Sequence, residues 1–285
     1  MRPDAEILVI GGGSRIAALL ADHLGDRAAC VTRRPTGRNN EILVADYADV
    51  PPTCFASRRC VVNCVGTSEG DAATLEQVNV ATPLAIARAA RDAGVRHMIH
   101  ISSFSVYGAA RTIDRTTTER PTGDYGRSKL AADRALRDLA TPDFDVTLLR
   151  LPLVYGGRTR GKLEQLIGLW SRLGILPVPA VDVRRAMIGV DLSAQVVLQL
   201  IDAPKTHVVL AADPSPFTYS GVAQVRPGLR RLPLGRAVTT LVERLAPSIG
   251  SRLFADSALA DSDNAAIRYG LSSRLYRDIA AIAPL

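Results

Sequence analysis

The amino-acid sequence predicts an α/β fold, a doubly wound parallel sheet followed by a small C-terminal lobe. Short apolar runs alternate with helix-length segments up to about residue 155, and a glycine-rich turn joins the first run to the first helix. Beyond Gly156 this rhythm changes, and a helix lies between loops that contain glycine and proline. Strands that alternate with helices of this length form right-handed βαβ units, which build a parallel sheet with helices on both faces.

The predicted strands are short apolar runs, the pattern of strands that are buried on both faces of a sheet. In order, they are residues 6–10, 28–32, 42–45, 60–65, 97–102, 146–151 and 207–211. Apolar residues at helical spacing predict the helices, and Gly94 is a typical residue at a helix C-terminus. The helices are residues 15–24, 75–93, 124–139 and 163–173, and segment 185–201 has the pattern of a strand followed by a helix.

Two domains are expected for a chain of 285 residues with this organisation. Residues 1–155, joined again by 186–211, form the sheet domain. Residues 156–185 and 212–285 form the lobe, whose Pro- and Arg-rich part after residue 214 contains no obvious motif. We expect this lobe to cap the carboxyl edge of the sheet and to bind the substrate.

The composition favours a cytoplasmic globular protein. Hydrophobic residues make up 47% and charged residues 22% of the chain, and no apolar run approaches the roughly 18 residues that span a bilayer. The N-terminus lacks the layout of a signal peptide. The four cysteines are too irregularly spaced for a disulfide framework or a zinc site, so no metal is expected. The net charge of +7 is spread along the chain without a basic block, which gives nucleic-acid binding no support.

The glycine-rich turn after the first strand predicts a dinucleotide site. A phosphate needs backbone N–H groups that point at it and no side chain in the way, and glycines between a strand and a helix N-terminus provide both. The strand–turn–helix context so near the N-terminus makes this pattern more specific than a glycine triplet alone. The expected cofactor-binding residues of the turn are Gly11, Gly13, Ser14, Arg15 and Ile16.

Two arginines after the second predicted strand favour NADP over NAD. An acidic residue at this place would hold the ribose hydroxyls of NAD, whereas Arg33 and Arg34 suit the additional phosphate of NADP. NAD remains the alternative, because both arginines could be solvated loop residues. Asp46, after the third strand, could accept a hydrogen bond from the adenine amino group or face solvent.

Tyr125 and Lys129 form the strongest catalytic pattern in the chain. Four residues separate them, so both lie on one face of the predicted helix 124–139. An ammonium near a phenol favours the phenolate, which would lower the tyrosine pKa and make it a usable acid or base near neutral pH. A serine at the end of the neighbouring strand, in the pair Ser102-Ser103, could hydrogen-bond the reacting oxygen.

Together these motifs resemble an extended short-chain dehydrogenase/reductase of the NAD(P)-dependent epimerase/dehydratase type, a group with a Rossmann fold that modifies nucleotide-sugars. The resemblance runs nearly end to end. Besides the glycine turn and the Tyr125–Lys129 segment, it is carried by residues 61–66, Asn79-Val80, 94–103, Tyr107-Gly108, 149–156, 185–191 and 262–271.

The resemblance assigns further residues. It implies that Ser103 is the catalytic serine beside Tyr125 and Lys129 and also contacts the substrate. It further implies that Val65, Tyr125, Lys129 and Pro152 contact the cofactor, with Lys129 holding the nicotinamide ribose. It also implies that Arg185 holds the diphosphate of a nucleotide-sugar substrate, and that the chain forms a homodimer through helices 75–93 and 124–139.

Three departures from the family pattern bear on function. Ser14 and Ala17 replace the second and third glycines of the family's turn, and both are small enough to keep it. Phe104 and Ser105 stand where sugar dehydratases have Asp and Glu, which disfavours dehydration. Leu153 stands where many 4-epimerases have Asn, as in bacterial nucleotide-sugar 4-keto reductases.

The expected function is therefore NADPH-dependent reduction of a 4-keto nucleotide-diphosphate sugar, with Tyr125 as the proton donor. A UDP-sugar 4-epimerase with tightly bound NAD is the alternative among enzymes. A regulatory protein that binds NAD(P) without catalysis is the alternative from another class. An intact set of Ser103, Tyr125 and Lys129 argues against it, because a sensor needs no proton donor.

Overall fold

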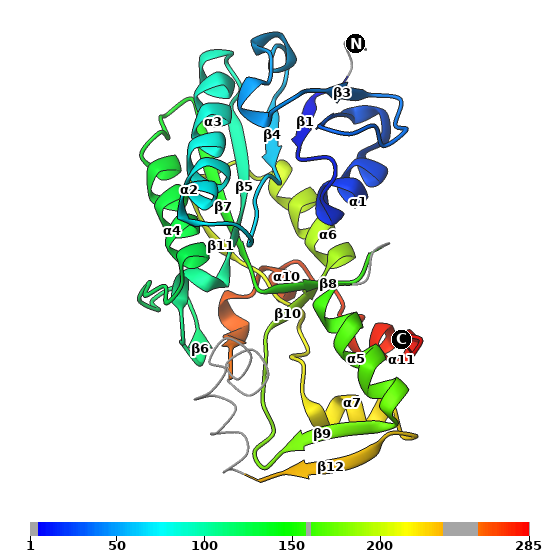
Figure 1. The fold of residues 1–285 in the computed structure, drawn as a ribbon. Helices are drawn as coiled ribbons and strands as arrows, with labels where there is room; N and C mark the ends of the chain where they lie inside the picture. Colours follow the sequence, from blue (N-terminus) through cyan, green and yellow to red (C-terminus); the bar gives the residue numbers. More distant parts are fainter. Residues whose placement is uncertain (1–4, 158–160, 236–255, 285) are drawn as a thin grey trace. The chain divides into compact units, whose positions relative to one another are not determined.

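A computed structural model describes residues 5–157, 161–235 and 256–284 of the chain (Figure 1). The chain divides into two compact units. The first comprises the residues up to Gly108 together with Glu119–Leu151 and Ser193–Leu210. The second comprises Ala109–Thr118, Pro152–Leu192 and the residues from Ala211 onward.

The first unit is built on a seven-stranded sheet in which every neighbouring pair is parallel. Its order is β11-β7-β5-β4-β1-β2-β3. The strands are β1 (Ile7–Ile10), β2 (Ala28–Thr32), β3 (Glu41–Leu43), β4 (Cys60–Asn63), β5 (His97–Ser103), β7 (Asp145–Leu151) and β11 (His207–Leu210). The order reverses direction between β1 and β4, the place where doubly wound sheets bind ligands beyond the carboxyl ends of their strands. The predicted fold class is confirmed.

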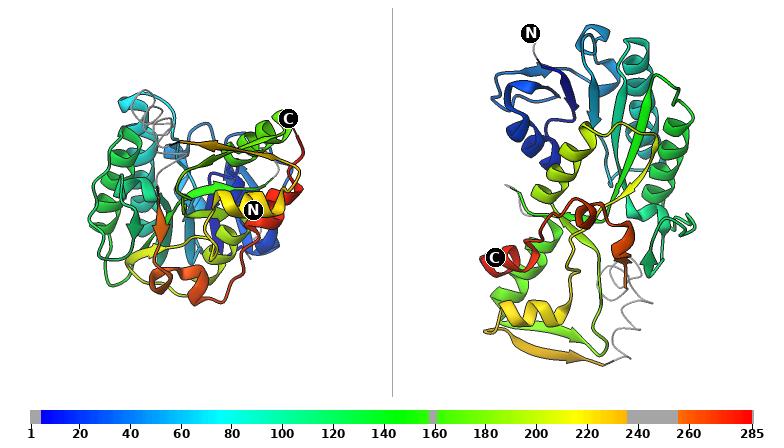
Figure 2. Two further views of the ribbon diagram at one scale, coloured as in Figure 1. Left: turned by 90° about the horizontal axis from the view of Figure 1, so that it is seen from below. Right: turned by 180° about the vertical axis from the view of Figure 1, so that it is seen from behind.

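Helices cover this sheet on both sides (Figures 1 and 2). They are α1 (Arg15–Leu24), α2 (Ala72–Glu76), α3 (Thr82–Asp92), α4 (Asp124–Arg137) and α6 (Val190–Ile201). The single helix predicted over residues 75–93 is divided by a π-helical turn at Gln77–Ala81, because one extra residue fits between α2 and α3. Asn79 lies in the middle of this turn and is fully buried.

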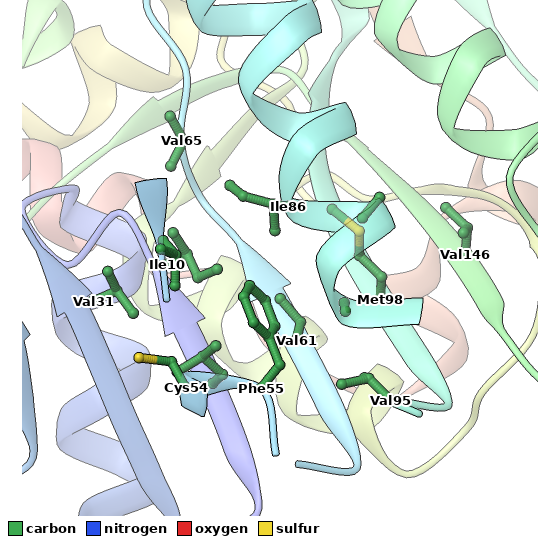
Figure 3. Packing of buried hydrophobic residues seen from close by; sticks show 14 of the residues in the cluster. Ile10, Val31, Cys54, Phe55, Val61, Val65, Ile86, Val95, Met98 and Val146 are labelled. Atoms are coloured by element: carbon green, nitrogen blue, oxygen red, sulfur yellow. The ribbon is translucent and has the colours of Figure 1, made fainter. Parts of the chain in front are cut away.

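Apolar side chains from the strands and α3 form the core on one face of the sheet (Figure 3). Ile86 from α3 packs with Val61 of β4 and Met98 of β5, and Phe55 closes the cluster from the loop before β4. All four side chains are at most 1% exposed. Full burial of a side chain of this size stabilises a fold by about 1.5–3 kcal/mol, so this cluster fixes the strands that carry the site.

His97 is a buried polar residue on β5 with a consequence for stability. Its Nε2 lies 2.9 Å from the hydroxyl of Thr147, which itself donates to the Lys205 carbonyl, so Nε2 carries the proton. Burial lowers the pKa of His97 from its ordinary 6.5 to about 4. As the pH falls, His97 is therefore protonated in the unfolded chain before it is protonated in the folded protein. Its contribution to the free energy of unfolding is fully present above pH 6.5 and is lost as the pH falls from 6.5 through 4.

We expect His97→Gln to flatten this pH dependence. Between pH 7 and pH 4.5 the wild type should lose up to about 3 kcal/mol more unfolding free energy than the variant, since one pKa unit corresponds to about 1.4 kcal/mol. Urea unfolding at each pH measures the difference. His23→Gln, at an exposed position, is the control. Equal pH slopes for wild type and His97→Gln would show that His97 does not titrate in this way.

In the part of the second unit that the structure describes, there are three short parallel strand pairs and several helices. The pairs join β8 (Leu153–Tyr155) to β10 (Met187–Gly189), β9 (Ile175–Pro179) to β12 (Arg230–Leu234), and β6 (Thr112–Ile113) to β13 (Ala258–Leu259). The helices are α5 (Lys162–Leu173), α7 (Tyr219–Val225), α10 (Ala265–Arg268) and α11 (Leu275–Ala281). Aromatic pairs organise its core, with the ring of Tyr219 5.8 Å from that of Trp170 and 5.5 Å from that of Phe217.

Within the residues that the structure describes, no helix is both long and apolar enough to cross a membrane. The same part of the chain holds no group of three or more His, Cys, Asp or Glu side chains arranged to bind a metal ion.

Candidate active site

The glycine-rich turn lies between β1 and α1, at the carboxyl end of a central strand. Gly11 has a φ of +94°, and a Cβ there would lie 3.0 Å from the backbone that follows β4. A Cβ on Gly13 would meet nothing within 4 Å, so that side of the turn is open. The Ser14 hydroxyl caps α1 by accepting a hydrogen bond from the Ala17 amide at 3.1 Å. A close-packed inner side and an open outer side at a helix N-terminus fit the diphosphate of a dinucleotide.

Two predicted cofactor residues point their side chains into the core. Ile16 is 8% exposed and Val65 is 6% exposed. This burial favours contact with a dinucleotide through their backbone atoms. Arg15, the first residue of α1, is half-buried.

Arg33 and Arg34 follow β2 directly and are both exposed. The Arg33 guanidinium lies over the ring of Tyr47, 5.2 Å from its centre. The Thr32 hydroxyl donates to the carbonyl of Arg34 at 2.8 Å, which orders the chain where it leaves the strand. Asp46 uses its carboxylate to cap the short turn Tyr47–Asp49, accepting from the Ala48 amide at 2.8 Å. Its role in this structure is therefore a local cap.

Lys129 lies on the buried face of α4, where its side chain is surrounded by the carboxyl ends of β4 and β5. It is 3% exposed, and its Nζ donates to the Ile101 carbonyl at 2.7 Å. Nζ also lies 3.1 Å from Nε2 of His100. Burial lowers the pKa of Lys129 to about 8, against the opposing effects of Asp133 and Cys64.

Ser103 and Tyr125 meet at the end of β5. A hydrogen bond between them lowers the pKa of Tyr125, but burial is the larger effect and raises it overall. The lowered tyrosine pKa expected from the Tyr125–Lys129 spacing is therefore not found, because desolvation of the phenolate outweighs the hydrogen bond that favours it. Ser103 also accepts hydrogen bonds from the amide and hydroxyl of Ser105, the latter at 2.7 Å.

A buried ionic cluster connects α4 to the strands beneath it. The Nε of Arg150 on β7 donates to Asp133 of α4 at 2.9 Å, and its Nη1 donates to the phenol of Tyr107 at 2.8 Å. Arg150 also pairs with Glu119, and its guanidinium lies 5.1 Å from the centre of the Tyr107 ring. Because Asp133 is one turn beyond Lys129, this cluster holds the helix that carries Tyr125 and Lys129.

The π-helical turn is joined to α4 by Asn79. Its Nδ2 donates to the Ser128 hydroxyl and to the Thr67 carbonyl, each at 2.9 Å, and its Oδ1 accepts from the Thr67 amide at 2.9 Å. This places the loop after β4 beside α4, the helix that carries Tyr125 and Lys129.

Pro152 and Arg185, the remaining predicted residues, belong to the second unit. Pro152 directly precedes β8. Arg185 exchanges backbone hydrogen bonds with Phe217, at 2.9 and 2.8 Å, and its charge acts on the phenol of Tyr219. Their predicted contacts with nicotinamide and diphosphate remain predictions.

Two buried polar residues were missed by the sequence analysis. Asn63 and His100 are both 0% exposed and occupy paired positions in the register of β4 and β5. Asn63 interrupts the otherwise apolar run 60–65, and a polar residue in such a run is the signal that could have found it. His100 contacts Lys129 and thus belongs to the site.

The fold and the glycine turn define a dinucleotide-binding protein of the doubly wound α/β class. Residues 7–209 match the model of the NAD dependent epimerase/dehydratase family, and the chain belongs to that family.

Individual relatives are more distant. A UDP-glucose 4-epimerase of Vibrio cholerae is 29% identical over 168 residues, which are 54% of this chain and 51% of the epimerase. The uncharacterized protein y4nL of Sinorhizobium fredii is 26% identical over 162 residues, 54% of this chain and 45% of that protein. The chain thus spans about half the length of the curated relatives it matches.

Solved structures resemble the chain over almost its whole length. MoeE5 in complex with UDP-glucose and NAD has a TM-score of 0.70 at 22% identity, covering 97% of both chains. A putative epimerase from Burkholderia cenocepacia has a TM-score of 0.76 at 16% identity, covering 99% of this chain and 98% of the other. At these identities the likeness establishes the shared fold.

Proposed function

We propose that this protein catalyses the NADPH-dependent reduction of a 4-keto group on a nucleotide-diphosphate sugar. The observation that carries the proposal is the grouping of Ser103 and Tyr125, joined by a hydrogen bond, at the strand edge where Lys129 is also buried. Family membership supports a nucleotide-sugar as the substrate.

The proposal gives each of the chain's own site residues a chemical role. A bound nicotinamide dinucleotide supplies the hydride, and the glycine turn would hold its diphosphate. Tyr125 donates its phenolic proton to the oxygen of the reduced carbonyl, and its raised pKa keeps that proton in place at neutral pH. Ser103 hydrogen-bonds the same oxygen, and Lys129 binds the nicotinamide ribose. Arg185 holds the substrate diphosphate, for which a guanidinium is well suited.

The direct test measures NADPH oxidation at 340 nm against a panel of UDP- and dTDP-4-keto sugars, after identification of any dinucleotide released by denaturing the purified protein. Turnover with at least one 4-keto sugar supports the proposal. Interconversion of UDP-hexoses without turnover of any 4-keto sugar would overturn it.

The preference for NADP rests on Arg33 and Arg34. Both are exposed where β2 ends, and Arg33 lies over the ring of Tyr47. Among the residues that the structure describes, neither guanidinium has to leave an ion pair in order to bind a phosphate. We expect the double variant Arg33→Ser/Arg34→Ser to weaken NADPH binding by about 10- to 100-fold, since a charge-assisted hydrogen bond contributes about 1.5–3 kcal/mol. NADH binding should change little.

Titration of each reduced cofactor by calorimetry gives both affinities. Arg27→Ser, which removes another exposed arginine from the first unit, is the matched control. Equal losses for NADPH and NADH in the double variant would contradict recognition of the additional phosphate.

A second candidate is 4-epimerisation of a UDP-sugar with NAD. It is favoured by the similarity to the Vibrio cholerae UDP-glucose 4-epimerase and by the MoeE5 structure, which contains UDP-glucose and NAD. An epimerase oxidises and re-reduces one sugar, so the purified protein would carry tightly bound NAD and show no net change at 340 nm. The assay above therefore separates the two candidates. A homodimer in the cytoplasm remains the expectation for either.

A further inference from the structure

A chain of hydrogen bonds that runs from the end of β4 through β5 to Lys129 determines where the protons lie on these side chains. It begins at the backbone N–H of Val65, which lies 3.0 Å from one side-chain atom of Asn63. A backbone N–H can only donate, so this atom must be the amide oxygen of Asn63. The other end of the same amide is then its NH₂ group.

The orientation of Asn63 determines the tautomer of His100. The Asn63 NH₂ lies 3.0 Å from Nδ1 of His100, and because it donates, Nδ1 must be the unprotonated nitrogen that accepts. Burial holds the pKa of His100 well below its ordinary value, so the ring is neutral. Its single proton is therefore on Nε2.

The proton on Nε2 of His100 points at Lys129. Nε2 and the Lys129 Nζ are 3.1 Å apart, so a hydrogen bond between them needs Nζ to accept. An ammonium has three donors and no acceptor, whereas a neutral amine has a lone pair. The amine can accept from His100 and still donate to the Ile101 carbonyl at 2.7 Å.

We propose that His100 is a positioning residue that holds Lys129 as a neutral amine in the ligand-free protein at neutral pH. His100 acts through the tautomer that Val65 and Asn63 impose on it. The inference concerns the site of the proposed function, but the charge of Lys129 can be measured without any substrate.

The other titratable groups that face Lys129 do not supply a free negative charge. Asp133, one turn further along α4, is paired with Arg150 at 2.9 Å. The pKa of the Cys64 thiol, beyond β4, is raised by burial to about 12, so the thiol is neutral. Tyr125 on the same helix is protonated at neutral pH, because burial raises its pKa as well. Asp133 favours the ammonium, but burial outweighs it and lowers the pKa of Lys129 to about 8. The proposal therefore requires the hydrogen bond from His100 to lower this pKa further, to below 7.5.

The composition of the chain makes the proposal directly measurable. Lys129, Lys162 and Lys205 are its only lysines, so protein labelled with ¹³C at lysine Cε gives three resonances. Lys162 and Lys205 are both exposed and serve as internal references. The chain has four histidines, so ¹⁵N spectra of their rings identify the tautomer of each. Lys129→Met and His100→Phe assign the two resonances of interest by their loss.

In the ligand-free wild type we expect the Lys129 resonance in the amine position at pH 7.5, and His100 as the neutral Nε2–H tautomer. In His100→Phe the midpoint of the Lys129 titration should rise by at least about one unit, a tenfold shift toward the ammonium, because the donor that favours the amine is gone. His97→Phe, which removes another buried histidine of β5, should leave that midpoint unchanged.

Asn63→Asp provides a second, opposite test. Its carboxylate accepts from the Val65 N–H and, with its other oxygen, from His100 Nδ1, so His100 should change to the Nδ1–H tautomer and Lys129 to the ammonium. A wild-type Lys129 that is an ammonium at pH 7.5, or a wild-type His100 with its proton on Nδ1, would overturn the proposal. These wild-type spectra decide it even if a variant does not fold, and they are independent of whether any sugar is turned over.

Discussion

Tyr125→Phe is expected to lower kcat for the proposed reduction by about 10²- to 10⁴-fold, the usual contribution of a positioned general acid. The substitution removes the phenolic proton and keeps the ring. Tyr125 is hydrogen-bonded to Ser103 in the wild type. In the variant, the Ser103 hydroxyl can still hydrogen-bond the carbonyl oxygen of the substrate, but the phenol that donates the proton is missing. Steady-state kinetics with the 4-keto sugar that gives turnover measure the effect.

Binding and folding should be little affected by this change. Calorimetric titration with NADPH should show only a small loss of affinity, because phenylalanine keeps the ring and removes one hydroxyl. The unfolding temperature should match the wild type, because the phenol is not part of the core cluster. Ser103→Ala should have a smaller effect than Tyr125→Phe, since it removes a hydrogen bond and not the donated proton. If Tyr125→Phe kept wild-type kcat, or left the protein's role in the cell intact, a non-catalytic NAD(P)-binding protein would become the better interpretation.

The raised pKa of Tyr125 also defines the pH dependence of the reductive direction. The phenol must be protonated to act as an acid, and burial moves its pKa above the ordinary 10. Reduction should therefore stay active through neutral pH and decline only in strongly alkaline buffer, whereas a lowered tyrosine pKa would give a decline near neutrality.

The sequence predicted those site residues whose relation is local. The spacing of Tyr125 and Lys129 places both on one face of a helix. The strand pattern indicated only the pair Ser102-Ser103, and the choice of Ser103 came from the family resemblance. The glycine turn is likewise a continuous segment between β1 and α1. For such residues the period of the element determines the geometry, and the amino-acid pattern is sufficient.

Residues that meet only through strand order could not be predicted in this way. Asn63 and His100 face each other because β4 and β5 are neighbours in a register that pairs them. That register depends on how the whole sheet assembles.

Prolines hid two strands of the second unit from the sequence analysis. Both β9 and β12 contain proline, which disfavours a strand in sequence patterns, yet the two strands pair with each other as a short two-stranded ribbon.

The largest stability effect is expected from Arg150. This guanidinium is buried, with 4% of its side chain exposed, and it neutralises Asp133, whose side chain is 1% exposed. Arg150→Met keeps most of the side-chain volume but leaves the Asp133 carboxylate without its counterion and the Tyr107 hydroxyl without a partner donor. Breaking a buried pair in this way costs about 3–5 kcal/mol of unfolding free energy, which urea unfolding at pH 7 measures.

Two comparisons separate this cost from a general effect of losing an arginine. Arg27→Met breaks the Arg27–Glu6 pair, whose side chains are 55% and 37% exposed, and should cost no more than about 1 kcal/mol. Adding Asp133→Leu to Arg150→Met should recover much of the loss, because the uncompensated charge is removed with it. A double variant no more stable than Arg150→Met would show that packing, and not the buried carboxylate, sets the cost.

Arg150→Met should also weaken cofactor binding in protein that still folds. Asp133 and Arg150 hold α4 against β7, so the loss of this pair should displace Lys129 and lower the affinity for NADPH.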